Sequence, residues 1–148
     1  MAIARTITQL SIPDDGQETA SKVAREAILR GIGALVLFSV GTIHFLQIVG
    51  TFSQTPLLGV SYLVLIAASL GVAVRLLAGG DDRTWAAAGI IGVAVIAGYV
   101  FTRLLKTPLD NQDVGNWSCM LGLASLFVEA ALVALSAYAM RARRIGAI

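Results

Sequence analysis

The chain has 148 residues, of which 57% are hydrophobic and 14% are charged, whereas soluble domains average about 25% charged residues. This composition excludes a water-soluble fold of this size, because such a fold would expose far too much apolar surface. The formal net charge of +2 does not indicate nucleic-acid binding, because the basic residues lie at the ends of apolar segments rather than in one stripe.

Residues 1–30 precede the first apolar segment and predict a cytoplasmic N-terminal segment. Pro13 reads as part of a turn, and either Asp14 or Asp15 would cap a short amphipathic helix that runs to about residue 30. We expect this helix to lie on the inner membrane surface or to extend the first membrane span. A docking site for a partner is the alternative.

Four apolar segments of membrane-spanning length follow, and residues 141–148 form a basic cytoplasmic tail. The segments lie at about 31–52, 57–78, 85–105 and 117–140. Each segment is at least as long as the about 20 helical residues that cross the hydrocarbon core. Lipid cannot form hydrogen bonds with exposed backbone groups, so each segment must be a helix. The short connections force neighbouring helices to run antiparallel. The sequence therefore predicts an all-α integral membrane bundle of up-down-up-down topology over residues 31–140.

Basic residues predict the orientation of this bundle. One side carries Lys22, Arg25, Arg30, Arg75, Arg83, Arg141, Arg143 and Arg144. The opposite side has only Arg103 and Lys106. The positive-inside rule therefore places both termini in the cytoplasm, and an aromatic belt would place Trp85 at the inner interface and Trp117 at the outer one.

Helical spacing predicts which faces of the spans look inward. On the fourth span, small and polar residues recur at intervals of three, four and seven residues: Ser118, Gly122, Ser125, Glu129 and Ser136. Such stripes normally mark contacts between helices in a membrane.

Depth along the helices brings four polar side chains together. With a rise of about 1.5 Å per residue, His44 lies roughly 12 Å below the outer end of its helix and Glu129 lies roughly 18 Å below Trp117. Tyr62 and Tyr99 fall in the outer half of the membrane. We therefore predict a buried cluster of His44, Tyr62, Tyr99 and Glu129.

The predicted cluster has three interpretations. A neutral histidine bonded to a protonated glutamate, or an ion pair of the two, would fix the helix register. A proton relay also needs titratable groups at different depths, so proton-coupled transport through Glu129 is one alternative. A haem, metal or pigment site at His44 is another, because histidine is a common ligand. We predict no cofactor held by this chain alone, because a single histidine needs a second ligand from a partner.

The outer connections predict a small extracytoplasmic cap that contains Arg103, Lys106, Asp110, Asp113 and Trp117. Surface ion pairs explain its charged residues. Its oxygen-rich segment lacks the terminal glutamate and the central glycine of an EF-hand. No phosphate loop, nucleophile elbow or zinc-protease motif occurs, so we expect no catalytic residues and no enzyme activity.

Three motifs carry a resemblance to known proteins: Pro56-Leu57-Leu58-Gly59, Gly115-Asn116-Trp117, and Leu121-Gly122-Leu123-Ala124-Ser125-Leu126-Phe127-Val128-Glu129. They resemble a group of small four-helix integral membrane proteins of actinobacteria and related bacteria. The resemblance implies a bacterial inner-membrane protein and marks His44, Trp117 and Glu129. The group has no assigned activity, so the resemblance bears on the fold rather than on the function.

The chain departs from that group in two places. It has Lys106-Thr107-Pro108-Leu109 where the pattern has a Gly-Leu-Pro-like turn, and it has Met120 where a proline often precedes Leu-Gly. Both departures fall at the outer connection.

The chain has little sequence outside its apolar segments and no catalytic motif, which predicts an accessory or assembly subunit of a larger membrane protein complex. Its expected partners are the lipid bilayer, other membrane protein subunits and further copies of itself, and not nucleic acid. The alternatives are the His44 redox protein and the Glu129 transporter described above.

Overall fold

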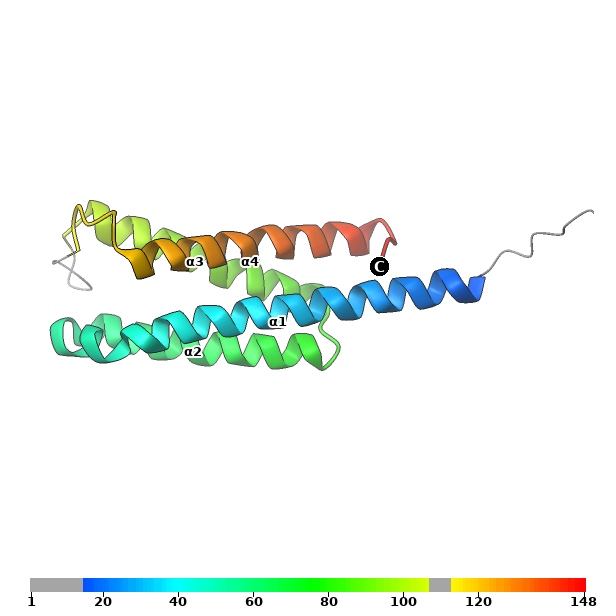
Figure 1. Cartoon of the computed structure of the whole chain (residues 1–148), viewed down its shortest axis with the longest axis horizontal. Coiled ribbons are helices and arrows are strands. Elements are labelled where there is room, and N and C mark those ends of the chain that lie inside the picture. The colour runs from blue at the N-terminus through cyan, green and yellow to red at the C-terminus, as the bar shows by residue number, and fades with distance from the viewer. Residues whose placement is uncertain (1–14, 107–112) are drawn as a thin grey trace, which may run out of the picture.

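The computed structural model describes residues 15–106 and 113–148, and within these ranges the regular elements are four helices. They are α1 (Asp15–Gln54), α2 (Pro56–Leu77), α3 (Asp82–Leu104) and α4 (Met120–Arg144). Each is long and apolar enough to cross a membrane, which confirms the four predicted apolar helices. The helices lie side by side, and the chain reverses direction at each connection (Figure 1).

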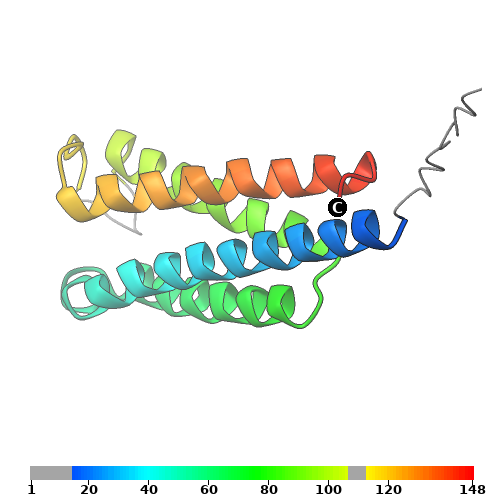
Figure 2. The same ribbon diagram turned by 45° about the vertical axis from the view of Figure 1, so that its right-hand side comes forward.

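The helices form two closely packed pairs. α1 packs along α2 and α3 packs along α4, whereas the contacts between the two pairs, mainly α1 with α4 and α2 with α3, are fewer. Figure 2 shows the same two pairs from another side. We call the end with the α1–α2 and α3–α4 connections the loop end, and the end with the α2–α3 connection and the C-terminus the terminal end.

α1 is one continuous helix of 40 residues, so its N-terminal part extends the first span and is not a separate amphipathic helix. No proline interrupts it, and a glycine within a helix costs only about 1 kcal/mol. An ion pair of 2.9 Å between Lys22 and Glu18 supports its first turns. This part projects beyond the other helices (Figure 1). Pro13 and Asp14 lie outside the described residues, and Asp15 is the first residue of α1.

Local sequence explains where α2 and α3 begin. Pro56 opens α2, where a missing N–H does no harm. Asp81 caps α3: its carboxylate accepts hydrogen bonds from the Thr84 N–H at 2.9 Å and from the Thr84 hydroxyl at 2.7 Å. These bonds hold the pKa of the Asp81 carboxyl below its usual value. The connection between the two helices turns at Gly79, whose φ of 108° suits glycine.

The bundle core lies toward the terminal end and centres on Trp85, which is fully buried. A Cβ atom at Gly33 of α1 would lie 2.8 Å from Cη2 of the Trp85 ring, so the ring occupies a slot that only glycine leaves open. The Trp85 indole therefore packs between helices and does not face outward as the side chain of an aromatic belt would.

Ion pairs join three helices at the terminal end. Arg143 of α4 contacts Asp82 of α3 at 2.6 Å and also pairs with Glu26 of α1. Glu26 in turn accepts a hydrogen bond of 2.6 Å from Arg30. These contacts link the projecting part of α1 to the rest of the bundle.

The predicted inward face of α4 is confirmed for four of its five residues. Gly122, Ser125, Glu129 and Ser136 are buried, whereas Ser118 precedes the helix and is exposed. Small residues on this face bring α4 close to α3, as expected for helices in a membrane.

Gly92 and Gly98 of α3 allow a matched test of this close approach. A Cβ atom at Gly92 would lie 2.8 Å from Val133 Cγ2 and 3.0 Å from the backbone oxygen of Glu129, whereas a Cβ atom at Gly98 would meet nothing within 4 Å. We expect Gly92→Ala to lower the free energy of unfolding by about 1–3 kcal/mol, because two helix backbones must separate. Gly98→Ala should leave it unchanged or raise it by up to about 1 kcal/mol. Thermal unfolding in detergent, followed by circular dichroism, measures both; equal unfolding temperatures would contradict the close approach.

Candidate functional site

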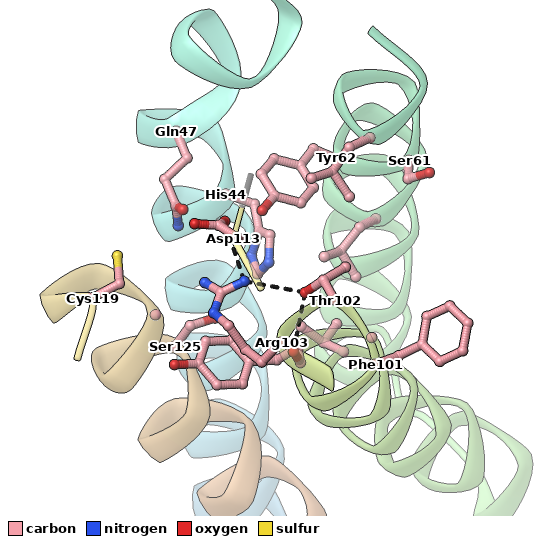
Figure 3. A pocket seen from close by; sticks show the side chains of 16 residues that line it. His44, Gln47, Ser61, Tyr62, Phe101, Thr102, Arg103, Asp113, Cys119 and Ser125 are labelled. Atoms are coloured by element: carbon pink, nitrogen blue, oxygen red, sulfur yellow. Dashed lines mark hydrogen bonds and ion pairs between the residues drawn. The ribbon is translucent and has the colours of Figure 1, made fainter. Parts of the chain in front are cut away.

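A cavity of about 250 Å³ lies between the four helices toward the loop end. All four helices contribute to its wall, together with two residues of the segment before α4 (Figure 3). Its polar lining residues are His44, Gln47, Ser61, Tyr62, Tyr99, Thr102, Arg103, Asp113, Cys119 and Ser125. Three of the four residues of the predicted cluster therefore face one cavity.

His44 is buried, with 4% of its surface exposed, and lies against Tyr62 of α2. The two ring centroids are 4.8 Å apart and the rings are almost perpendicular, at 89°. His44 Nδ1 lies 2.9 Å from the carbonyl oxygen of Val40, one helical turn earlier. Because a carbonyl only accepts, Nδ1 carries the proton, and Nε2 of the neutral ring keeps its lone pair. A histidine held in this way can accept a hydrogen bond or bind a metal through Nε2.

Arg103 forms one wall of the cavity and is buried, with 7% of its surface exposed. Its guanidinium lies 3.1 Å from the Asp113 carboxylate, donates to the Asn116 carbonyl at 2.6 Å and donates to the Thr102 hydroxyl at 3.1 Å. The ion pair expected for the outer cap thus forms, but its arginine lies inside the protein. The cause is the segment before α4, which folds back over the end of α3: the Gly115 N–H donates to the Arg103 carbonyl.

Tyr99 contacts Arg103 in the same wall of the cavity. The Arg103 guanidinium carbon lies 4.4 Å from the centre of the Tyr99 ring, within the range of a cation–π contact. The Tyr99 hydroxyl donates to the Trp117 carbonyl at 3.3 Å, and the two rings meet at 6.2 Å. Tyr99 therefore fastens the segment before α4 to α3. A close approach of Gly122 to the Tyr99 ring completes this contact.

Glu129 lies behind the cavity wall rather than on it. Its side chain is fully buried, and its Oε1 accepts a hydrogen bond of 2.5 Å from the Ser125 hydroxyl on the same helix. Its Oε2 has no hydrogen-bond partner in the part of the chain that the structure describes. Within residues 15–106 and 113–148, the contacts include no hydrogen bond or ion pair between Glu129 and His44. Glu129 therefore reaches the cavity only through Ser125.

The remaining predicted site residues lie at the loop end. Trp117 is 46% exposed, and Lys106 is exposed beyond the end of α3. Asp110 lies outside the described residues. Cys119 has a free thiol, is half-buried and lines the cavity.

A second cavity of about 360 Å³ adjoins the first at the loop end. The two cavities share five lining residues, which are Gln47, Leu58, Tyr62, Asp113 and Cys119. The second cavity adds polar groups from the last turn of α1, Thr51 and Gln54, and from Thr55 between α1 and α2. This space could not be predicted from the sequence, because it depends on how the segment before α4 folds.

The donor set limits the metal chemistry of the site. Within the described ranges, no group of three or more histidine, cysteine, aspartate or glutamate side chains could hold a metal ion. Any metal or haem bound at His44 Nε2 would therefore take further ligands from outside the described residues.

Comparison with protein-family models, with curated proteins and with solved structures gave no match for this chain. The function is therefore argued from the cavity and from the surface of the bundle.

Proposed function

We propose that this chain is a multi-pass protein of a bacterial cytoplasmic membrane that binds a small ligand in the cavity at the loop end. In this proposal the four helices cross the bilayer in up-down-up-down order and both termini are cytoplasmic. The chain has no catalytic group of its own; it holds its ligand for another protein or for passage across the membrane.

The exposed side chains support membrane insertion. Large apolar residues are well exposed on helices throughout the bundle, for example Val49 at 79%, Phe127 at 77% and Ile90 at 68%. In water such surfaces would drive aggregation, whereas in a bilayer they contact lipid tails. The four apolar helices are compatible with a multi-pass membrane protein.

The charge distribution supports the orientation. Arg75, Arg141 and Arg144 lie in the last turns of α2 and α4, at the terminal end. At the loop end, Arg103 is paired with Asp113 and only Lys106 is an exposed cation among the described residues. The positive-inside rule then places the terminal end in the cytoplasm and the cavity near the outer face.

The cavity is the observation that carries ligand binding. Its volume of about 250 Å³ lies near the lower limit of ligand pockets, which usually measure about 300–1,000 Å³. A few polar groups converge on it from different helices, among them His44 Nε2 and the Ser125 hydroxyl. A cavity that combines apolar walls with convergent polar groups is typical of a binding site for a small molecule.

Native mass spectrometry of the protein, extracted from its own membrane with mild detergent, tests this proposal. We expect the wild-type protein to retain a bound small molecule. Gly98→Leu should lower the bound fraction by about tenfold, because Gly98 lines the cavity at a position exposed to the outside and a Cβ atom there meets nothing within 4 Å, so the new side chain narrows the open side of the cavity.

Gly71→Leu is the matched control, because Gly71 also has nothing within 4 Å of a built Cβ atom and is exposed on α2 away from the cavity. It should retain the ligand. A wild-type protein with only the mass of the bare chain would contradict ligand binding. A visible absorption spectrum of the same sample identifies a haem or pigment held through His44.

An accessory role in a larger complex is the second candidate, favoured by the projecting part of α1. Val23 and Ile28, in the N-terminal half of α1, are 63% and 61% exposed. The first turns of α1 extend beyond the other three helices (Figure 1), so this half of α1 offers an apolar surface to another membrane subunit. The same gentle extraction would then retain partner subunits together with the chain.

A further inference from the structure

We infer that the ligand is an amphiphile of the outer leaflet whose apolar chain enters the cavity between α2 and α3. Its head group lies in the second cavity at the loop end and donates hydrogen bonds without carrying a net negative charge. This inference rests on the proposed function, and it names the class of ligand that the site takes.

The side of the cavity between α2 and α3 is open to the surroundings of the bundle. These two helices share the fewest contacts of any neighbouring pair. Ser61, Gly98 and Phe101 both line the cavity and are exposed on the outside of the bundle. Ser61 lies five residues into α2 and Gly98 lies six residues before the end of α3, so both lie roughly 8–9 Å below the loop end. Two of the smallest residues of this wall therefore lie at the same depth on the two helices, where the wall is exposed.

The surface around this gap would contact lipid rather than water. Val60 and Val64 of α2 are 49% and 64% exposed, and Leu104 of α3 is 61% exposed. A solute in water would have to cross this apolar surface to reach the opening. A lipid chain lies beside the opening already, because the same surface is its ordinary contact in a bilayer.

The interior of the first cavity suits an apolar chain. Leu58, Leu65 and Val95 line it. These side chains come from α2 and α3, the helices that flank the opening. A chain that enters from the side therefore passes along apolar walls before it meets the polar groups near His44.

The second cavity suits a polar head group. It continues from the first through shared residues, and its additional polar residues are uncharged: Thr51, Gln54 and Thr55. Amide and hydroxyl groups of this kind accept hydrogen bonds from a hydroxylated head group. Together the two cavities thus offer an apolar compartment that opens to lipid and a polar compartment at the membrane surface.

The charges that line both cavities disfavour an anionic head group. Among the described residues, Arg103 is the only lysine or arginine that lines either cavity. Its guanidinium is already engaged by the Asp113 carboxylate, the Asn116 carbonyl and the Tyr99 ring. A phosphate would therefore find no unpaired guanidinium or ammonium group in the described lining of either cavity, whereas a hydroxyl finds an acceptor.

Photo-crosslinking in vesicles tests this inference. The full chain is reconstituted in phosphatidylcholine vesicles, whose head groups donate no hydrogen bond, with a trace of diacylglycerol that carries a diazirine on one acyl chain, and the crosslinked residues are mapped by mass spectrometry. We expect Leu65, which lines the cavity, to be labelled about tenfold more than Val64, which faces outward on α2. Phosphatidic acid with the same diazirine chain should label the cavity residues about tenfold less than diacylglycerol does.

Gly98→Leu should remove the excess labelling of Leu65, and Gly71→Leu should preserve it. Equal labelling of Leu65 and Val64 in the wild-type protein would overturn the inference, and so would stronger labelling by phosphatidic acid. Two outcomes distinguish a wrong ligand class from a failure of the proposed ligand binding. A water-soluble molecule retained in native mass spectrometry, without cavity labelling, would keep the proposed function and exclude the amphiphile; a bare chain without cavity labelling would exclude both.

Discussion

Replacing Arg103 with alanine should lower the free energy of unfolding by about 2–3 kcal/mol. The change leaves the Asp113 carboxylate, the Asn116 carbonyl and the Thr102 hydroxyl without the guanidinium that they contact. It also removes the cation from the Tyr99 ring. The segment before α4 is held to α3 largely through these contacts. We therefore expect the loop end of the bundle to unfold first when the protein is heated. Thermal unfolding in detergent, followed by tryptophan fluorescence, measures the loss.

Two further variants show whether the planar geometry of the guanidinium contributes to the free energy of unfolding. Arg103→Lys keeps the charge but cannot contact three acceptors in the same geometry, so it should lose part of the stability. Lys106→Ala is the control, because Lys106 is exposed three residues further on and pairs with no described carboxylate. An unfolding temperature for Arg103→Ala that matches Lys106→Ala would show that the buried contacts contribute nothing.

The four helices could be predicted from the sequence, because long apolar runs follow simple rules. Runs of apolar residues of the right length require helices, and short connections require neighbouring helices to be antiparallel. The stripe of small and polar residues on the fourth span also predicted the buried face, since Gly122, Ser125, Glu129 and Ser136 all lie inside. The exact ends of α1 were less predictable, because a helix can continue through Gly31 without a signal in the sequence.

The candidate site was predictable only in part. His44 and Tyr62 could be paired by depth, and their rings are indeed in contact. Depth alone could not show which way a side chain turns around its helix. Glu129 turns toward Ser125 on its own helix, and its carboxylate is bonded there rather than to His44.

Features that depend on distant segments could not be predicted at all. Arg103 looked like a surface residue near the end of a span, and it is buried because residues after 112 fold back over it. The slot for Trp85 needs a glycine at position 33, more than fifty residues earlier in the chain. Sequence periodicity describes one helix at a time, whereas both features arise where segments meet.

Trp85→Ala should lower the free energy of unfolding by about 3–5 kcal/mol. The ring is fully buried in the core between Gly33 and Leu76, so its removal leaves a void that these neighbours only partly close. In a membrane the loss comes mainly from missing van der Waals contacts, because lipid tails are as apolar as the core. Unfolding in detergent by heat or by denaturing surfactant, followed by circular dichroism, measures it.

Trp85→Phe separates packing from hydrogen bonding. The Trp85 Nε1 atom is buried without a hydrogen-bond partner in the part of the chain that the structure describes, so its removal costs no bond there. Phenylalanine keeps an aromatic ring in the slot, and we expect it to lose less than about 1.5 kcal/mol. Trp117→Ala is the matched control, because Trp117 is 46% exposed at the loop end. If Trp85→Ala and Trp117→Ala unfolded at the same temperature, Trp85 would have no special place in the core. If Trp85→Phe were as damaging as Trp85→Ala, the indole N–H would have a partner that the packing argument omits.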